Sequence, residues 1–206
     1  MTALRIPETC GVMPLPDCVL FPHGGLPLHI FEPRYRRMLA DAIDGDCMFA
    51  VTRLFARETA DLRNCAAEVG TIGLIRASRE LEDGTSHLLL HGLIRVRFTA
   101  WVAGHPYPTA AIQPLACVFE PEEQAAAAAR VLRASVEDAT EDMPDEVRSP
   151  ILAISRSTED PALLTDIVAQ QFVGDPALRQ SILEMDSAAA RIPPLCEYLR
   201  TRMTHD

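Results

Sequence analysis

The sequence predicts an α+β protein: a curled antiparallel or mixed β-sheet of the pseudo-barrel type, with one helix, followed by a C-terminal α-helical bundle. Nine of the ten glycines lie before residue 116. Residues 1–115 carry 11 arginines and 12 acidic residues, a net charge of −1, whereas residues 116–206 carry 8 and 17, a net charge of −9. Short apolar runs between turn residues also give way there to helical periodicity. We therefore expect a β-rich domain over residues 1–118 and an acidic helical domain over 119–206.

Six segments of the first part alternate or run apolar between turn signals, as strands do. They are residues 12–15, 26–31, 47–54, 69–81, 86–102 and 108–115. Gly84 is placed to take the positive φ of a hairpin turn between the two longest strands. In the last long strand, one face carries Leu88, Leu90, Gly92, Ile94 and Val96 and is the better candidate for the core. His87 and His91 share the other face, about 13 Å apart at ~3.3 Å per residue, which is too far to chelate one metal ion.

One helix interrupts this β region. It should begin with Pro33 at its first position and turn Tyr35, Met38, Leu39 and Ile43 inward at helical spacing. The second part reads as helical from near Pro121. There, apolar residues follow the i, i+3, i+4, i+7 pattern: Ala125, Ala128, Ala129, Leu132, Val136 and Ala139.

Two further helices are predicted by an aspartate at the N-cap followed by proline, at Asp160 and at Asp175. A last helical segment should run from Ser187 to near Met203. Because a proline inside a helix costs ~3 kcal/mol, we expect a break or a new helix start at the pair 193–194. The acidic residues Glu141, Asp142, Asp145 and Glu146 could suggest a cation site, but their spacing favours a solvated loop.

The absence of lysine excludes two kinds of catalytic site. All nineteen basic residues are arginines. A Walker A loop needs lysine to reach the phosphates of a nucleotide, and a Ser-Lys protease dyad needs a lysine that can lose its proton, which arginine cannot do. We therefore expect no catalytic residues and no cofactor. With 206 residues, and at roughly 100–200 residues per domain, the chain is also expected to be too short to hold an ATPase domain and a protease domain beside a third one.

Other function classes are also disfavoured. The six cysteines form no Cys-x-x-Cys pair, so a zinc site is not expected. A net charge of −10 argues against nucleic-acid binding, which depends on neutralising phosphates. There is no apolar signal segment and no apolar run of ~18 residues, so we expect a cytoplasmic protein without a membrane partner.

The segment from Met13 to Tyr35 carries the most specific pattern. An apolar Pro-Leu run is followed by Phe21-Pro22, by Leu26-Pro27-Leu28 and by Phe31-Glu32-Pro33-Arg34-Tyr35. A second block, Val69-Gly70-Thr71-Ile72-Gly73, and a third, Asp83-Gly84-Thr85 with His91-Gly92-Leu93-Ile94-Arg95-Val96, follow in order. These blocks closely resemble the N-terminal, substrate-binding domain of Lon proteases and cover most of residues 11–115. The helical tail resembles the same family more weakly.

The resemblance implies a module that contacts unfolded or tagged polypeptide segments through an apolar surface. Leu20, Phe21, Pro22, Leu26 and Pro27, in the proline-glycine loop, are the candidates for that surface, although such residues are more often core. A cleft between the two domains is an alternative place. The competing hypothesis is an adaptor that docks on one folded partner, such as a separate protease or chaperone.

The remaining residues of the family pattern are expected to be structural: Glu32, Pro33, Arg34, Tyr35, Gly70, Gly73, Gly84, Gly92 and Arg95. Glu32 and Arg95 could form an internal ion pair; two unrelated surface charges are the alternative.

Overall fold

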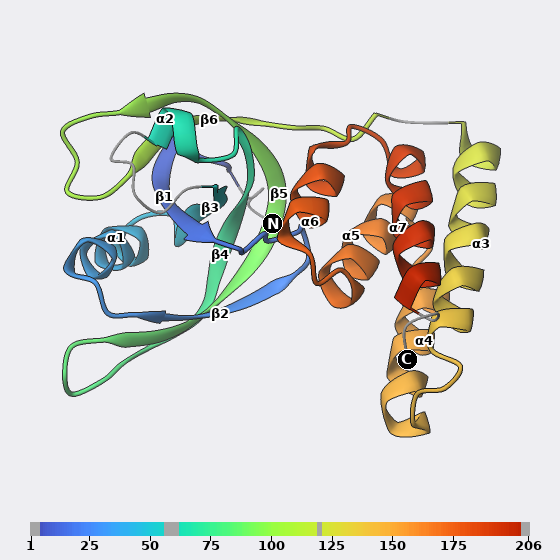
Figure 1. Ribbon diagram of the computed structural model, residues 1–206. Coiled ribbons are helices and arrows are strands. Elements are labelled where there is room, and N and C mark those ends of the chain that lie inside the picture. Colours follow the sequence, from blue (N-terminus) through green and yellow to red (C-terminus); the bar gives the residue numbers. More distant parts are fainter. Residues whose placement is uncertain (1–4, 56–61, 119–120, 203–206) are drawn as a thin grey trace. The chain divides into compact units, whose positions relative to one another are not determined.

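The computed structural model describes residues 5–55, 62–118 and 121–202 (Figure 1). The chain divides into two compact units, Met1–Leu115 and Ala116–Asp206, which we call the β unit and the helical unit. That each is a domain able to fold alone stays a prediction. In the described part of the chain, no helix is both long and apolar enough to span a membrane.

The β unit is a six-stranded mixed sheet with two helices, one of them very short. Its elements are β1 (Thr9–Pro16), β2 (Gly25–Ile30), α1 (Pro33–Asp44), β3 (Met48–Leu54), α2 (Leu62–Cys65), β4 (Val69–Glu80), β5 (Ser86–Val102) and β6 (Thr109–Pro114). The six predicted strands and the first helix are confirmed, whereas α2 was not predicted.

The sheet curls on itself because β5 pairs with three other strands. The strand order is β2-β5-β4-β3-β1-β6, and β5 also pairs with β6, which closes five strands into a ring and leaves β2 outside it. Only β1 and β3 run parallel; the other pairs are antiparallel. The predicted curled, mixed sheet is confirmed.

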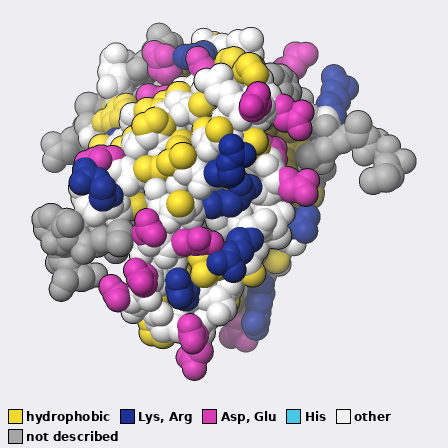
Figure 2. All heavy atoms as spheres, turned by 90° about the vertical axis from the view of Figure 1, so that its right-hand side faces the viewer, with side chains coloured by type: hydrophobic (Ala, Val, Ile, Leu, Met, Phe, Trp, Pro, Cys, Tyr) yellow, Lys and Arg dark blue, Asp and Glu magenta, His cyan; other side chains and the backbone are white. Residues whose placement is uncertain are grey.

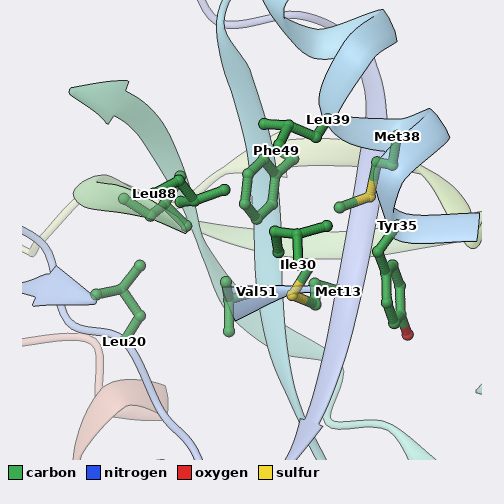
Figure 3. Packing of buried hydrophobic residues seen from close by; sticks show 10 residues of the cluster. Met13, Leu20, Ile30, Tyr35, Met38, Leu39, Phe49, Val51 and Leu88 are labelled. Carbon is green, nitrogen blue, oxygen red and sulfur yellow. The ribbon is translucent and has the colours of Figure 1, made fainter. Parts of the chain in front are cut away.

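Helix α1 covers one side of this sheet. Its buried residues Tyr35, Met38 and Leu39 point towards side chains of the strands, as Figure 3 shows. The cluster consists of Met13, Leu20, Ile30, Tyr35, Met38, Leu39, Phe49, Val51, Leu88 and Leu90. The expectation that Ile43 also points inward is wrong: it is 46% exposed, since no residue of the last turn of α1 reaches the cluster.

A second cluster uses other residues of β1, β3 and β5, together with residues of β4 and β6. It consists of Cys10, Val12, Met48, Ala50, Ile72, Val96, Ala110 and Ile112. Strand β3 therefore contributes consecutive residues to opposite sides of the sheet, Phe49 to the first cluster and Ala50 to the second. The closed part of the sheet thus buries side chains on both faces, whereas β2 and the parts of β4 and β5 beside it leave one face open to solvent.

The helical unit contains α3 (Glu122–Ala139), α4 (Asp145–Ser157), α5 (Pro161–Phe172), α6 (Pro176–Glu184) and α7 (Ala188–Arg202). Both predicted caps are confirmed: the Asp160 carboxylate accepts from Ala162 N at 2.8 Å, and the Asp175 carboxylate accepts from Ala177 N at 3.0 Å. Each satisfies a backbone donor that the first turn of its helix would leave without a partner.

Two expectations for this unit are wrong. The break at Pro193 and Pro194 does not occur, because α7 continues through both prolines. Burial of Leu195 and Leu199, at 0% and 1% exposure against neighbouring helices, offsets the lost backbone hydrogen bonds.

The loop expected around the acidic cluster is interrupted by α4, which was not predicted. Asp145 and Glu146 lie in its first turn. Carboxylates are favourable there because the N-terminus of a helix carries partial positive charge.

Candidate functional site

Most of the predicted binding loop is core. Leu20 and Phe21 are 1% and 0% exposed, and Pro22 is also buried. Leu20 belongs to the cluster in Figure 3. Leu26 is half-buried and Pro27 is exposed. In this structure only Leu26 and Pro27 of the five candidates can offer a surface to another molecule.

Polar contacts hold this loop against β4 and β5. The Thr71 hydroxyl donates to the Leu20 carbonyl at 2.6 Å. His23 N donates to the Gly92 carbonyl, and Gly92 N donates to the Gly24 carbonyl, both at 2.8 Å. A Cβ atom at residue 92 would overlap the Phe21 carbonyl, so only glycine allows the loop to approach β5 this closely. The buried position of Phe21 thus requires glycine at residue 92, in the third block.

Other residues of the family pattern also make contacts within the β unit. A Cβ atom at Gly70 would overlap the Val51 carbonyl on the adjacent strand, and Gly84 has φ +76° in the predicted hairpin turn. Arg34 pairs with Glu32 at 2.8 Å and lies over the Tyr35 ring at 4.6 Å. Burial is the main cause that raises the pKa of Tyr35. Arg95 is 2% exposed in β5, and its ion pair with Glu32 stays a prediction.

The open part of the sheet presents a face that the sequence did not reveal. Three rows of directly paired residues cross β4, β5 and β2: Leu74–His91–Gly25, Ala77–Leu89–Pro27 and Arg79–His87–His29. Paired residues in an antiparallel sheet share a face. Their neighbours Leu88, Leu90 and Ile30 belong to the buried cluster on the opposite side. We call this set of nine residues the histidine face; Leu74 and His91 are half-buried, Leu74 against the second cluster, and the other seven are exposed.

The middle row of the histidine face is apolar. Leu89 is 43% exposed, and both Ala77 and Pro27 beside it are exposed. Phe31, which follows β2, is 60% exposed, and its ring lies 5.8 Å from that of His29. Large apolar side chains on one exposed sheet face indicate a contact surface rather than core.

Imidazoles flank the apolar row. The rings of His29 and His87 stack at 4.7 Å, and His23 packs edge-on against His91 at 6.3 Å. Burial, followed by the charges of Arg76 and His23, lowers the pKa of His91. Alternation along β5 predicted that His87 and His91 share a face. The partners from β2 and its preceding loop were missed because cross-strand register has no local signal.

Among the described residues, no strand pairs with the outer edge of β2 along this face. Since Gly24 and Gly92 are hydrogen-bonded, antiparallel alternation directs the backbone groups of residues 26, 28 and 30 towards β5, and those of Gly25, Pro27 and His29 away from it. Pro27 has no N–H to donate, which suits an edge position. The edge therefore offers carbonyls at residues 25, 27 and 29 and N–H groups at residues 25 and 29.

The described residues contain no group of three or more His, Cys, Asp or Glu side chains arranged to hold a metal ion. The chemistry of the histidine face is thus that of a contact surface: apolar in the middle, imidazole and guanidinium at its ends, and bordered by a strand edge.

Comparison with known proteins places the whole chain in one family. Residues 9–201 match the family model described as "ATP-dependent protease La (LON) substrate-binding domain". Lon protease of Trichlorobacter lovleyi is 24% identical over 198 residues, covering 95% of this chain and 24% of that protein. Lon protease of Escherichia coli K12 is 28% identical over 193 residues, covering 93% and 24%. The chain thus spans about a quarter of the length of the relatives it matches.

Solved structures agree in fold. The N-terminal domain of Mycobacterium avium complex Lon protease superposes with a TM-score of 0.75 at 14% identity, covering 94% of this chain and 98% of that one. A Lon N-terminal domain protein from Xanthomonas campestris gives 0.64 at 20% identity, covering 92% and 97%. With the family model matched from the first strand into the last helix, the chain belongs to the Lon substrate-binding domain family.

Proposed function

We propose that this chain is a non-catalytic module that binds unfolded or extended polypeptide segments in the cytoplasm, using the histidine face and the adjacent edge of β2. Membership of a substrate-binding family supports the general role. The observation that carries the proposal is the exposed apolar row of Ala77, Leu89 and Pro27 directly beside an unpaired strand edge.

An extended segment added to β2 would use both features at once. Its backbone would pair with the outward groups of Gly25 and His29 and with the carbonyl of Pro27, at the cost of one hydrogen bond that proline cannot donate. Alternate side chains of the segment would then lie on the same face as Pro27 and Leu89. Backbone pairing accepts many sequences, whereas the apolar row selects for apolar side chains.

Leu89→Asp tests the apolar row. We expect the mutant to bind a dye-labelled, reduced and carboxamidomethylated protein roughly tenfold more weakly than wild type, because burial of a leucine side chain is worth about 1.5–3 kcal/mol and ~1.4 kcal/mol is tenfold in Kd. Fluorescence anisotropy measures the affinity.

Ile43→Asp is the matched control, since Ile43 is exposed to a similar degree on α1, away from the histidine face. Circular dichroism should show both variants folded. Equal affinities of wild type and folded Leu89→Asp would exclude the apolar row as the contact surface.

Strand addition is tested on the ligand, which avoids altering the protein. Two versions of one binding peptide are made: one carries N-methyl groups on its odd-numbered residues, and the other carries them on its even-numbered residues. We expect one version to lose binding and the other to bind nearly as well as the unmethylated peptide, since only alternate amides of an added strand face β2. Equal affinity of the two methylated peptides, measured by fluorescence anisotropy, would rule out pairing with the edge of β2.

One observation favours the alternative of an adaptor docking on a separate folded protease or chaperone. The helical unit has its own apolar groove of about 240 Å³, lined from α3, α4 and α5 by Val136, Pro150, Ile151, Ile154, Ser155, Leu164, Ile167, Val168, Gln171 and Phe172. Figure 2 shows hydrophobic side chains gathered on part of this unit's surface, beside arginine and acidic groups. Val131 and Val147 are 57% and 51% exposed there.

Affinity capture from a cytoplasmic extract separates the two functions. Many unfolded proteins, lost with Leu89→Asp, support polypeptide binding. One stoichiometric partner, lost with Ile154→Asp and kept with Leu89→Asp, supports the adaptor.

A further inference from the structure

We infer that the preferred segments carry an apolar residue flanked by carboxylates, and that affinity for them rises as the imidazoles of the histidine face gain protons. This inference rests on the proposed function and names its substrate class and its pH dependence.

The ionisable groups of the histidine face are all basic. Its outer row brings together Arg79, His87 and His29, all exposed, while His91 lies in the row on the other side of Leu89. Arg76, at the bulge of β4, is exposed and acts electrostatically on His91. None of the nine residues of the face is acidic. A segment lying across the apolar row would therefore meet potentially cationic groups on both sides.

The neighbouring carboxylates lie outside the nine residues of the histidine face. Glu80 pairs with Ser86 in an alternate row, which directs it to the opposite side of the sheet. Asp83, in the hairpin turn, accepts from Thr85 N at 2.9 Å and from the Thr85 hydroxyl at 2.7 Å. These two hydrogen bonds, with a smaller contribution from His29, lower the pKa of Asp83, so this carboxylate stays charged and acts on His29 from the turn.

Two further charged groups border the turn. Glu82 is exposed within it, and α1 brings the Arg36 guanidinium beside Gly84. The turn thus holds two carboxylates, Glu82 and Asp83, and one guanidinium, whereas the ionisable groups on the face itself are the imidazoles and Arg79.

The imidazoles are arranged so that an added anion favours their protonation. His29 and His87 stack at 4.7 Å, and the Thr85 hydroxyl lies 3.2 Å from His29 Nε2. Two protonated rings at this distance repel each other, and a carboxylate of the bound segment would offset that repulsion. Because an imidazole gains a positive charge when it takes up a proton, such a carboxylate binds more tightly at lower pH.

The net charge of −10 does not reverse this preference. Exposed charges more than about 8 Å apart are largely screened at physiological ionic strength, so the groups in contact with the segment determine which flanks it prefers. Nearly all of that net charge also belongs to residues 116–206, whereas the β unit carries only −1.

The test uses the full chain and three dye-labelled peptides with the same apolar centre, flanked by Glu, Gln or Arg. At pH 6 and physiological ionic strength we expect the Glu-flanked peptide to bind about tenfold more tightly than the Gln-flanked one, and the Arg-flanked peptide to bind most weakly. The preference for Glu should shrink severalfold at pH 8. His29→Gln combined with His87→Gln should remove most of this pH dependence, and Arg79→Gln should weaken Glu-flanked binding at both pH values.

The possible results separate the two proposals. Equal affinity for all three peptides, or a preference for arginine, would overturn the inference while leaving polypeptide binding intact. If no peptide and no unfolded protein binds, the proposed function itself fails. A preference for Glu that is independent of pH and survives both histidine substitutions would contradict the role of the imidazoles.

Discussion

Asp166→Asn is expected to destabilise the helical unit by about 3–5 kcal/mol, because it leaves a buried guanidinium without its counter-charge. Arg191 on α7 is 0% exposed and donates to the Asp166 carboxylate on α5 at 2.8 Å, where Asp166 is 5% exposed. Arg191 also donates through Nη2 to the Met185 carbonyl at 3.0 Å. An asparagine oxygen can still accept one hydrogen bond but offers no charge in a place that water does not reach.

Urea unfolding followed by two probes measures this effect. Circular dichroism at 222 nm reports mainly on the helices, whereas fluorescence of Trp101, the only tryptophan, reports on β5. We expect the circular dichroism midpoint to fall sharply. If the two units unfold separately, the Trp101 midpoint stays in place, which also tests the predicted division into domains.

Two controls identify the cause. Glu197→Gln removes one partner of the exposed Glu197–Arg200 pair on the same unit and should leave both midpoints unchanged. The double substitution Asp166→Leu with Arg191→Met should recover much of the loss, since apolar replacement of a whole buried ion pair is often close to neutral. A circular dichroism midpoint for Asp166→Asn equal to that of wild type would show that the ion pair contributes nothing to stability.

Elements with local signals could be predicted from the sequence. Asp160 and Asp175, each followed by proline, supply both the side-chain acceptor and the fixed φ of a helix start, so α5 and α6 were found. Helix α4 has Pro144 at its N-cap, no side-chain cap and Pro150 in its interior, and it was missed. Prolines within α4 and α7 are tolerated through tertiary packing, which local patterns do not contain.

In the candidate site, too, features with a local signal could be predicted and features set by long-range contacts could not. Alternation within β5 predicted that Leu88 and Leu90 face the core and that His87 and His91 lie together on the other face. It wrongly placed Val96 on the side of Leu88 and Leu90, because a register shift near Gly92 brings Val96 into the second cluster. Joining His29 to them requires the register between β2 and β5, which is set by the whole sheet. The burial of Phe21 was likewise hidden, because a proline-glycine segment resembles an exposed loop until its contacts with Thr71 and Gly92 are known.

Gly92→Ala is expected to lower the stability of the β unit by about 3 kcal/mol, the upper part of the usual range for overpacking. The new methyl group would overlap the Phe21 carbonyl, and the loop cannot simply move away. The Thr71 hydroxyl holds it before Phe21, at Leu20, and backbone hydrogen bonds to residue 92 hold it after Phe21, at His23 and Gly24. A flexible side chain could rotate out of such a contact, but a backbone carbonyl cannot. The midpoint of urea unfolding by Trp101 fluorescence measures the loss.

Gly25→Ala is the matched control on the paired strand. Its Cβ would meet only Leu89 Cδ1, at an ordinary contact distance of 3.6 Å, and residue 25 is exposed. We expect a midpoint equal to or slightly above that of wild type, because alanine reduces the entropy of the unfolded chain. Equal losses for both variants would mean that strand conformation, rather than the close approach of the loop, requires glycine at residue 92. A loss confined to Gly92→Ala would instead show that one small residue in β5 allows the close approach that keeps Phe21 buried and His23 beside His91 at the histidine face.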